Sequence, residues 1–94
     1  MPLMRLEWTD RATRDLDRVG AYIAQDNPVA ATKTLKAIRK SATLLKRHPF
    51  MGRRTEFTDV RELVVHPNYL LSYRVSSDVV EVLQLWHAAQ NRYH

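Results

Sequence analysis

The sequence predicts an α+β domain in which an antiparallel sheet, formed by an N-terminal strand and a three-stranded C-terminal meander, carries an α-hairpin on one face. The meander is predicted by residues 60–87, where runs rich in Val, Leu and Tyr are broken by two short polar segments. β-Branched and aromatic side chains favour a pleated surface, and connections this short join antiparallel neighbours. The hairpin is predicted by residues 10–46, whose apolar side chains recur at helical spacing on both sides of one break.

The two turns of the meander are predicted at residues 66–68 (His-Pro-Asn) and 76–78 (Ser-Ser-Asp), because such residues restrict or bond their own backbone. Side chains alternate between the faces of a strand. The middle strand therefore has Leu70, Ser72 and Arg74 on one face, and Tyr69, Leu71, Tyr73 and Val75 on the other. The second face is the predicted core side, so Arg74 is expected on an open face.

Arg61 falls on the same side of its strand as Leu63 and Val65, although a β-bulge would turn its side chain toward the other face. At the other end of the chain, residues 3–8 (LMRLEW) alternate and place Met4, Leu6 and Trp8 on one apolar side. This first strand is distant in sequence from the meander, so it is expected at a sheet edge, where unpaired backbone groups invite another chain.

The first helix is expected to begin at a Thr9 or Asp10 cap and to run to about Gln25. Asn27 and Pro28 then suit the N-cap and first position of a second helix, which runs to about Lys46. The apolar stripes are Ala12, Leu16, Val19 and Ile23 in the first helix, and Ala31, Leu35, Ile38, Ala42 and Leu45 in the second. The predicted solvent-exposed face of the first helix consists of Arg11, Arg14, Asp15, Asp17 and Arg18. A two-residue break implies antiparallel helices whose stripes face the sheet.

Residues 50–58 are predicted to form a loop, with Phe50 or Phe57 tucked beneath it, and residues 88–94 to form a short helical turn or a frayed tail. The larger aromatic residues are expected in the core more often than as platforms for stacked bases. They are Trp8, Tyr22, Tyr73 and Trp86.

Composition indicates one globular domain over residues 1–94, since 45% of the residues are hydrophobic and only two are Gly and four Pro. The absence of Cys excludes disulfides, thiolate metal sites and cysteine nucleophiles. The four His have no tight spacing with carboxylates, so neither a metal nor a cofactor is expected. No apolar run could span a bilayer and no signal peptide opens the chain. A cytoplasmic location without membrane contact is therefore expected.

Positive charge is the strongest compositional signal, with a formal net charge of +5 and a pI near 10.0. Residues 27–55 contain no Asp or Glu, whereas they contain Lys33, Lys36, Arg39, Lys40, Lys46, Arg47, Arg53 and Arg54. This segment is either a solvated helix face or a docking surface for a phosphate backbone or an acidic protein.

The order of strand, helical hairpin and meander in a small, basic, Cys-free chain resembles the RelE/ParE superfamily of bacterial toxins. The resemblance is carried by ATRDLDRVGAYIAQDNPVAA, HPFMGRR, VRELVVHPNYLLSYRV and VEVLQLWHAAQ, which together span nearly the whole chain. It implies the toxin of a type II toxin–antitoxin pair, held with its cognate antitoxin in a hetero-oligomer. RelE-like members cut messenger RNA in the ribosomal A site, whereas ParE-like members inhibit DNA gyrase.

The resemblance also implies a possible nuclease site. Arg61 and Arg74 match arginines of the family meander, and His87 matches a histidine that some members carry after the last strand. In an RNase the two arginines would stabilise the phosphate and His87 would act as acid or base. Arg53 and Arg54 correspond to cationic residues that bind the RNA backbone.

Several positions depart from the nuclease pattern. Tyr69 and Leu70 stand where RelE-like nucleases often have a basic residue, and Glu56 is a poor counterpart of the loop carboxylate that some members use as a base. A C-terminal catalytic tyrosine would have to be Tyr93, on a tail that folds back. These departures favour the ParE-like branch, with the ribosome-dependent messenger RNA endonuclease as the alternative and an inactive, antitoxin-binding chain as a third.

Each candidate residue also has a purely structural interpretation. Arg61 would pair with Glu62 or Asp59 on the surface. Arg74 would pair across strands with Glu81, and His87 would cap the last strand.

Overall fold

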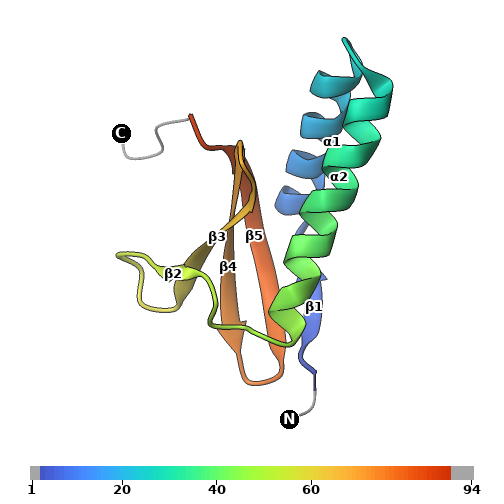
Figure 1. Ribbon diagram of the computed structural model, residues 1–94. Coiled ribbons are helices and arrows are strands. Elements are labelled where there is room, and N and C mark those ends of the chain that lie inside the picture. Colours follow the sequence, from blue (N-terminus) through green and yellow to red (C-terminus); the bar gives the residue numbers. More distant parts are fainter. Residues whose placement is uncertain (1–2, 90–94) are drawn as a thin grey trace.

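The structure, a computed structural model, describes residues 3–89 as one mixed sheet with two helices on one face (Figure 1). The elements in chain order are β1 (Arg5–Trp8), α1 (Asp10–Ala24), α2 (Pro28–Thr43), the 3-10 helix η1 (Leu44–Lys46), β2 (Arg53–Arg54), β3 (Val60–His66), β4 (Tyr69–Ser76) and β5 (Val79–His87). The strands lie in the order β1-β5-β4-β3-β2. The predicted α+β class and the α-hairpin are confirmed. No helix in residues 3–89 is long and apolar enough to cross a membrane.

The sheet differs from the predicted one in two respects. The β3-β4-β5 meander is antiparallel and β1 is an edge strand, as predicted, but β1 pairs parallel to β5. The prediction of an all-antiparallel sheet was therefore wrong, because side-chain alternation reports which face is apolar and carries no strand direction. The predicted loop at residues 50–58 also contains the two-residue strand β2, which pairs antiparallel with β3.

The helices begin where their capping residues predict. Thr9 Oγ1 accepts a hydrogen bond from the N–H of Ala12 at 3.1 Å, and Asn27 Oδ1 accepts one from the N–H of Ala30 at 3.0 Å. Each cap satisfies a donor that an N-terminal helical turn leaves without a partner. The second helix ends earlier than predicted, at Thr43, and continues as the tighter turn η1.

The core lies between the helical stripes and one face of the sheet. Ala12 and Leu16 of α1, together with Ile38 and Ala42 of α2, are buried against the sheet residues Leu63, Val65, Tyr69, Leu71, Tyr73, Val80, Val82 and Leu85. Trp8, Val19, Ile23, Leu35 and Val75 pack against this cluster while partly buried. The predicted core face of β4 is confirmed, because Tyr69, Leu71 and Tyr73 are all buried there.

Two predictions about aromatic side chains were wrong. Phe50 and Phe57 are exposed, at 63% and 57%, so neither lies beneath the loop. Tyr22 is 71% exposed, although it was expected in the core. Its position on α1 lies outside the apolar stripe, at the rim of a groove described below.

The loop before β2 is held by Tyr73 at the centre of the sheet. Tyr73 is fully buried, and its hydroxyl accepts a 2.9 Å hydrogen bond from the N–H of Gly52. Burial raises the pKa of the Tyr73 phenol above its usual 10.0, although the bond from Gly52 and the charge of Arg61 lower it in part. The phenol is therefore neutral at physiological pH. Gly52 lies so close to the sheet that a Cβ would be 2.7 Å from both the Glu62 carbonyl oxygen and the Tyr73 hydroxyl.

Replacement of Gly52 by Ala is expected to destabilise the fold by about 1–3 kcal/mol, the usual cost of overpacking. The matched control is Gly20→Ala in α1, where the added Cβ meets Leu35 Cδ1 at 2.8 Å. That atom ends a flexible side chain, and Ala gains about 0.5–1 kcal/mol of helix stability over Gly. Urea unfolding followed by circular dichroism measures both variants, and equal free energies of unfolding would contradict the packing described for Gly52.

Candidate functional site

Arg61 lies on the helix-facing side of β3, where it holds the loop that precedes β2. Its Nη1 donates to the carbonyl oxygens of Gly52 at 2.9 Å and Phe50 at 3.3 Å. Its guanidinium also lies over the Phe50 ring, 5.1 Å from the ring centroid. Surface pairing with Glu62 or Asp59 was wrong, because those carboxylates pair with Arg53 and Arg74. Arg61 therefore has a structural role in this part of the chain.

Arg74 lies on the opposite face of the sheet. It is in register with Val60 on β3 and with Glu81 on β5, whereas Arg61 is in register with Tyr73. Its Nε lies 3.0 Å from Asp59 Oδ2, in a geometry that makes an ion pair but not a hydrogen bond, and its Nη1 lies 3.7 Å from Glu81 Oε1. The predicted cross-strand pairing with Glu81 is confirmed. Because adjacent strand positions point to opposite faces, the sheet lies between the Arg61 and Arg74 side chains.

His87 lies at the far end of β5, in register with Tyr69. Its Nδ1 accepts a 3.0 Å hydrogen bond from the N–H of Ala89, and its ring meets the Tyr69 ring edge-on at 5.2 Å between centroids. Burial, followed by the neighbouring Tyr22, raises the pKa of the Tyr69 phenol. The register places His87 four residues along β4 from Arg61, about 13 Å at the usual rise of a strand. His87 therefore caps the end of the last strand, as expected.

The two arginines predicted to bind RNA occupy β2. Arg53 donates from Nε at 3.0 Å and from Nη2 at 2.7 Å to Glu62 Oε1, a carboxylate that is almost wholly buried. Arg54 is exposed and in register with Arg61. Glu56 is exposed in the loop that follows, and Tyr93 lies outside the described residues. The structure therefore does not bring Arg53, Arg61, Arg74 and His87 to one point.

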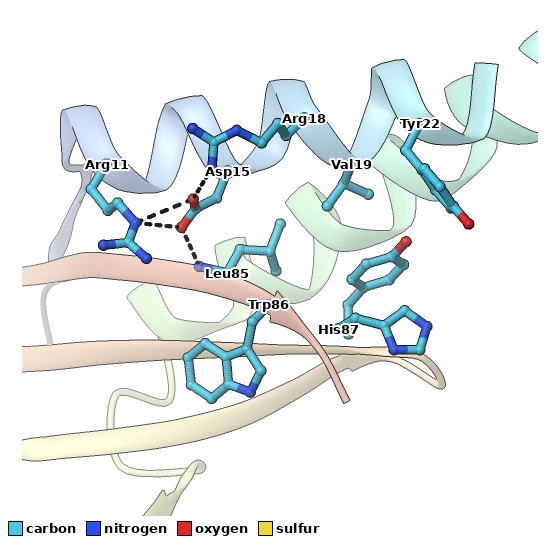
Figure 2. Close-up of a pocket in the computed structure, with 9 residues that line it drawn as sticks. Arg11, Asp15, Arg18, Val19, Tyr22, Leu85, Trp86 and His87 are labelled. Carbon is cyan, nitrogen blue, oxygen red and sulfur yellow. Dashed lines mark hydrogen bonds and ion pairs between the residues drawn. The ribbon is translucent and has the colours of Figure 1, made fainter. Parts of the chain in front are cut away.

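The structure also shows a groove between α1 and the end of β5, which we call the α1–β5 groove. It forms because β1 ends in register with Val82 whereas β5 continues to His87. The groove has a volume of about 530 Å³ and is lined by Arg11, Asp15, Arg18, Val19, Tyr22, Tyr69, Leu85, Trp86 and His87. Figure 2 shows the α1 side chains above it and the β5 residues below.

Asp15 organises the groove and was placed on the wrong face by the sequence prediction. It is buried, and its Oδ2 accepts a 3.1 Å hydrogen bond from the N–H of Leu85 on β5 (Figure 2). Arg11 Nε lies 3.3 Å from both carboxylate oxygens, and Arg18 Nη1 lies 3.8 Å from Oδ1. Asp15 thus takes the place of a strand partner where β1 has ended. Its position three residues after Ala12 and four before Val19 was the signal that could have revealed its burial.

Residues 6–92 match the sequence profile of a family described as the ParE toxin of the type II toxin–antitoxin system parDE. The chain belongs to the ParE toxin family. It is therefore a toxin of a type II toxin–antitoxin system within the ParE/RelE superfamily. The family resemblance found in the sequence is confirmed.

Relatives of this ParE-family chain are similar over nearly their whole length. The Sinorhizobium fredii protein Y4kP is 41% identical over 91 residues, which are 96% of this chain and 94% of the relative. Toxin RelE2 of Caulobacter vibrioides is 35% identical, over 94% of this chain and 99% of the relative. The solved structure of a chromosomal ParDE system from P. aeruginosa aligns with a TM-score of 0.79 at 26% identity, over 90% of this chain and 96% of that one.

Replacement of Asp15 by Ala is expected to cost this toxin about 1–3 kcal/mol of folding free energy, since the buried N–H of Leu85 loses its acceptor. The control is Asp17→Ala, an exposed acid on the same helix, with an expected change within about 0.5 kcal/mol. Chemical denaturation of both variants measures the difference. An Asp15 variant as stable as the Asp17 variant would show that this hydrogen bond contributes little.

Proposed function

We propose that this chain is a ParE-like toxin that inhibits DNA gyrase and is neutralised by a cognate antitoxin. The observation that supports the gyrase branch is the separation of the three nuclease candidates. Arg61 is on the helix-facing side of the sheet, Arg74 is on the opposite face, and His87 is at the far end of β5.

RNA cleavage by attack of a 2′-hydroxyl needs phosphate-binding and proton-transferring groups around one phosphate. A general acid or base must be within hydrogen-bond reach of the proton that it moves. The charged groups that stabilise the transition state must also be directed at the same phosphoryl oxygens. Arg61 is engaged by two carbonyl groups and Arg74 by two carboxylates, so use of either on a phosphate would require these contacts to be exchanged.

The second candidate function is a ribosome-dependent messenger RNA endonuclease. It is favoured by the similarity to toxins RelE2 and RelE3 of Caulobacter vibrioides, which are 35% and 32% identical to this chain. In that case Arg61, Arg74 and His87 would be the catalytic residues, and Arg53 and Arg54 would contact the RNA backbone.

Purified toxin is expected to inhibit DNA supercoiling by gyrase in a dose-dependent manner and to leave messenger RNA intact in a translating extract. Supercoiling is read on agarose gels, and cut sites are mapped by primer extension. The endonuclease alternative instead predicts cleavage that falls on the order of 10²-fold or more in Arg74→Ala and His87→Ala. Unchanged supercoiling together with such cleavage would overturn the gyrase proposal.

The antitoxin is proposed to occupy the α1–β5 groove, in which one wall is formed by α1 of the helical hairpin. The groove combines apolar and aromatic walls with the exposed cations Arg11 and Arg18. An apolar anchor flanked by charges is what a short segment needs when it folds on binding. The outer edge of β1, with no strand partner among residues 3–89, offers a second place for an added strand.

Reversal of charge at Arg18 is expected to weaken the toxin–antitoxin complex by at least 10-fold and to reduce its dependence on salt. The reason is that Arg18 lies at the groove rim, with a long 3.8 Å contact to Asp15 and a side chain that is 77% exposed. The matched control is Arg14→Glu, an exposed arginine of α1 that does not line the groove. Calorimetric titration of the protein encoded beside the toxin gene, at 0.05 and 0.5 M salt, measures both; equal losses would place the antitoxin elsewhere.

A further inference from the structure

The exposed side of α2 carries a row of cations that the proposed site does not use. We call this row the α2 basic face and define it as Lys33, Lys36, Arg39 and Lys40. All four are exposed. At 100° per residue Lys33, Lys36 and Lys40 lie opposite the buried stripe of Ala31, Ile38 and Ala42, and Arg39 lies at the flank between the two. Figure 1 shows α1 and α2 as one layer on the sheet, so the side of α2 opposite its buried stripe faces outward.

The α2 basic face has no acidic counter-ion among the described residues. Within residues 3–89, no Asp or Glu lies within ion-pairing distance of any of its four residues. By contrast, the cations that pair with carboxylates elsewhere are Arg5, Arg11, Arg18, Arg53 and Arg74. Four of the lysines and arginines in residues 3–89 that lack an acidic partner are therefore grouped on one helix, whereas the others, Arg14, Lys46, Arg47, Arg54 and Arg61, are spread over several elements.

The arrangement of these charges is unfavourable for an isolated helix. Lys33 and Lys36 are three residues apart, and Lys36 and Lys40 are four apart, so like charges are neighbours on the helix surface. Helix stability alone would favour acids spaced three or four residues from bases, as on α1, where Arg11 and Arg18 pair with Asp15. The repulsion on α2 is relieved when a polyanion lies along it.

We propose that the α2 basic face binds the phosphate backbone of duplex DNA without reading its sequence. Residues 33–40 of the helix rise about 10 Å, which matches about three base pairs at 3.4 Å each, or about six phosphates on the two strands. Charge is sufficient for this kind of binding, because the release of condensed counter-ions drives it.

The chemistry of the face favours a duplex over other partners. A protein partner needs buried apolar or aromatic anchors. The exposed residues at 33–40 offer none, because they are Lys33, Lys36, Ala37, Arg39 and Lys40. Single-stranded nucleic acid is bound by aromatic side chains on which bases stack, which this face also lacks. The choice of DNA over RNA rests on the proposed gyrase function, because gyrase acts on duplex DNA.

The experiment measures binding of the purified toxin to a fluorescein-labelled 24-base-pair DNA duplex by anisotropy, without gyrase or antitoxin. For about four phosphate contacts, the slope of log K against log salt concentration is expected to be about −3.6. The variant Lys36→Gln/Lys40→Gln should bring the slope to about −1.8 and weaken binding at least 10-fold at 0.1 M salt. The control Arg5→Gln/Arg14→Gln removes the same charge from other surfaces and should keep a slope near −3.6. Circular dichroism verifies that both variants are folded.

Several results would overturn the proposal. These are an absence of duplex binding, equal losses in the two double variants, or tighter binding to duplex RNA or to single strands of the same length. A Lys36/Lys40 variant that keeps its DNA affinity but loses the antitoxin would assign the face to the antitoxin instead. DNA binding by a toxin that leaves gyrase active would sustain this inference while the proposed function fails, so the two outcomes can be distinguished.

Discussion

Burial of one face of the sheet under the helical hairpin is the constraint on which the other features depend. Ile38 and Ala42 of α2 and Leu16 of α1 pack on Leu71 and Tyr73, which are fully buried. Each large apolar side chain removed from water contributes about 1.5–3 kcal/mol, and few other sources of stability exist in a short chain without Cys. Since the helices cover only one face, polar and charged groups are confined to the other face, to the ends of the sheet and to the outside of the helices.

The same constraint decides which charged residues can act together. Arg61 lies opposite Tyr73, which is the residue next to Arg74 on β4. Because adjacent residues of a strand point to opposite faces, Arg61 lies on the core side of the sheet and Arg74 on the other side. Arg61 is half-buried on the core side, and its guanidinium donates to the carbonyl oxygen of Gly52 at 2.9 Å. Neither side chain can change faces without a register shift that would expose Leu63 and Leu71. The separation of the arginines thus follows from the core, not from rotamer choice.

Local signals explain how much could be predicted from the sequence. The helical stripes, the Thr9 and Asn27 caps and the meander turns are each encoded within a few residues, and all were found. Alternation placed Arg61 beside Leu63 and Val65 and placed Arg74 on an open face, but the family resemblance grouped the two arginines in one site, so their separation was not predicted. The parallel direction of β1 depends on contacts between residues more than 70 positions apart. The spacing of Asp15 from Ala12 and Val19 indicates its burial, but its bond to Leu85 depends on where β1 stops relative to β5, and the chain pattern does not encode that end point.

The distribution of ion pairs separates the two helices of the hairpin into surfaces of different chemistry. On α1 the buried Asp15 neutralises one of its two neighbouring arginines, so the groove keeps a modest positive charge beside apolar walls. Such a surface suits a protein segment, because desolvated charges are tolerated in an interface when they are already paired. On α2 the charges are unpaired, exposed and arranged on the side that faces away from the sheet, so they remain hydrated and act over about one Debye length of 8 Å at physiological salt. Contacts of that kind suit a partner that is itself a continuous line of charge. The sheet covers only one side of the antiparallel hairpin. The hairpin can therefore present the α1–β5 groove to one partner and the α2 basic face to another.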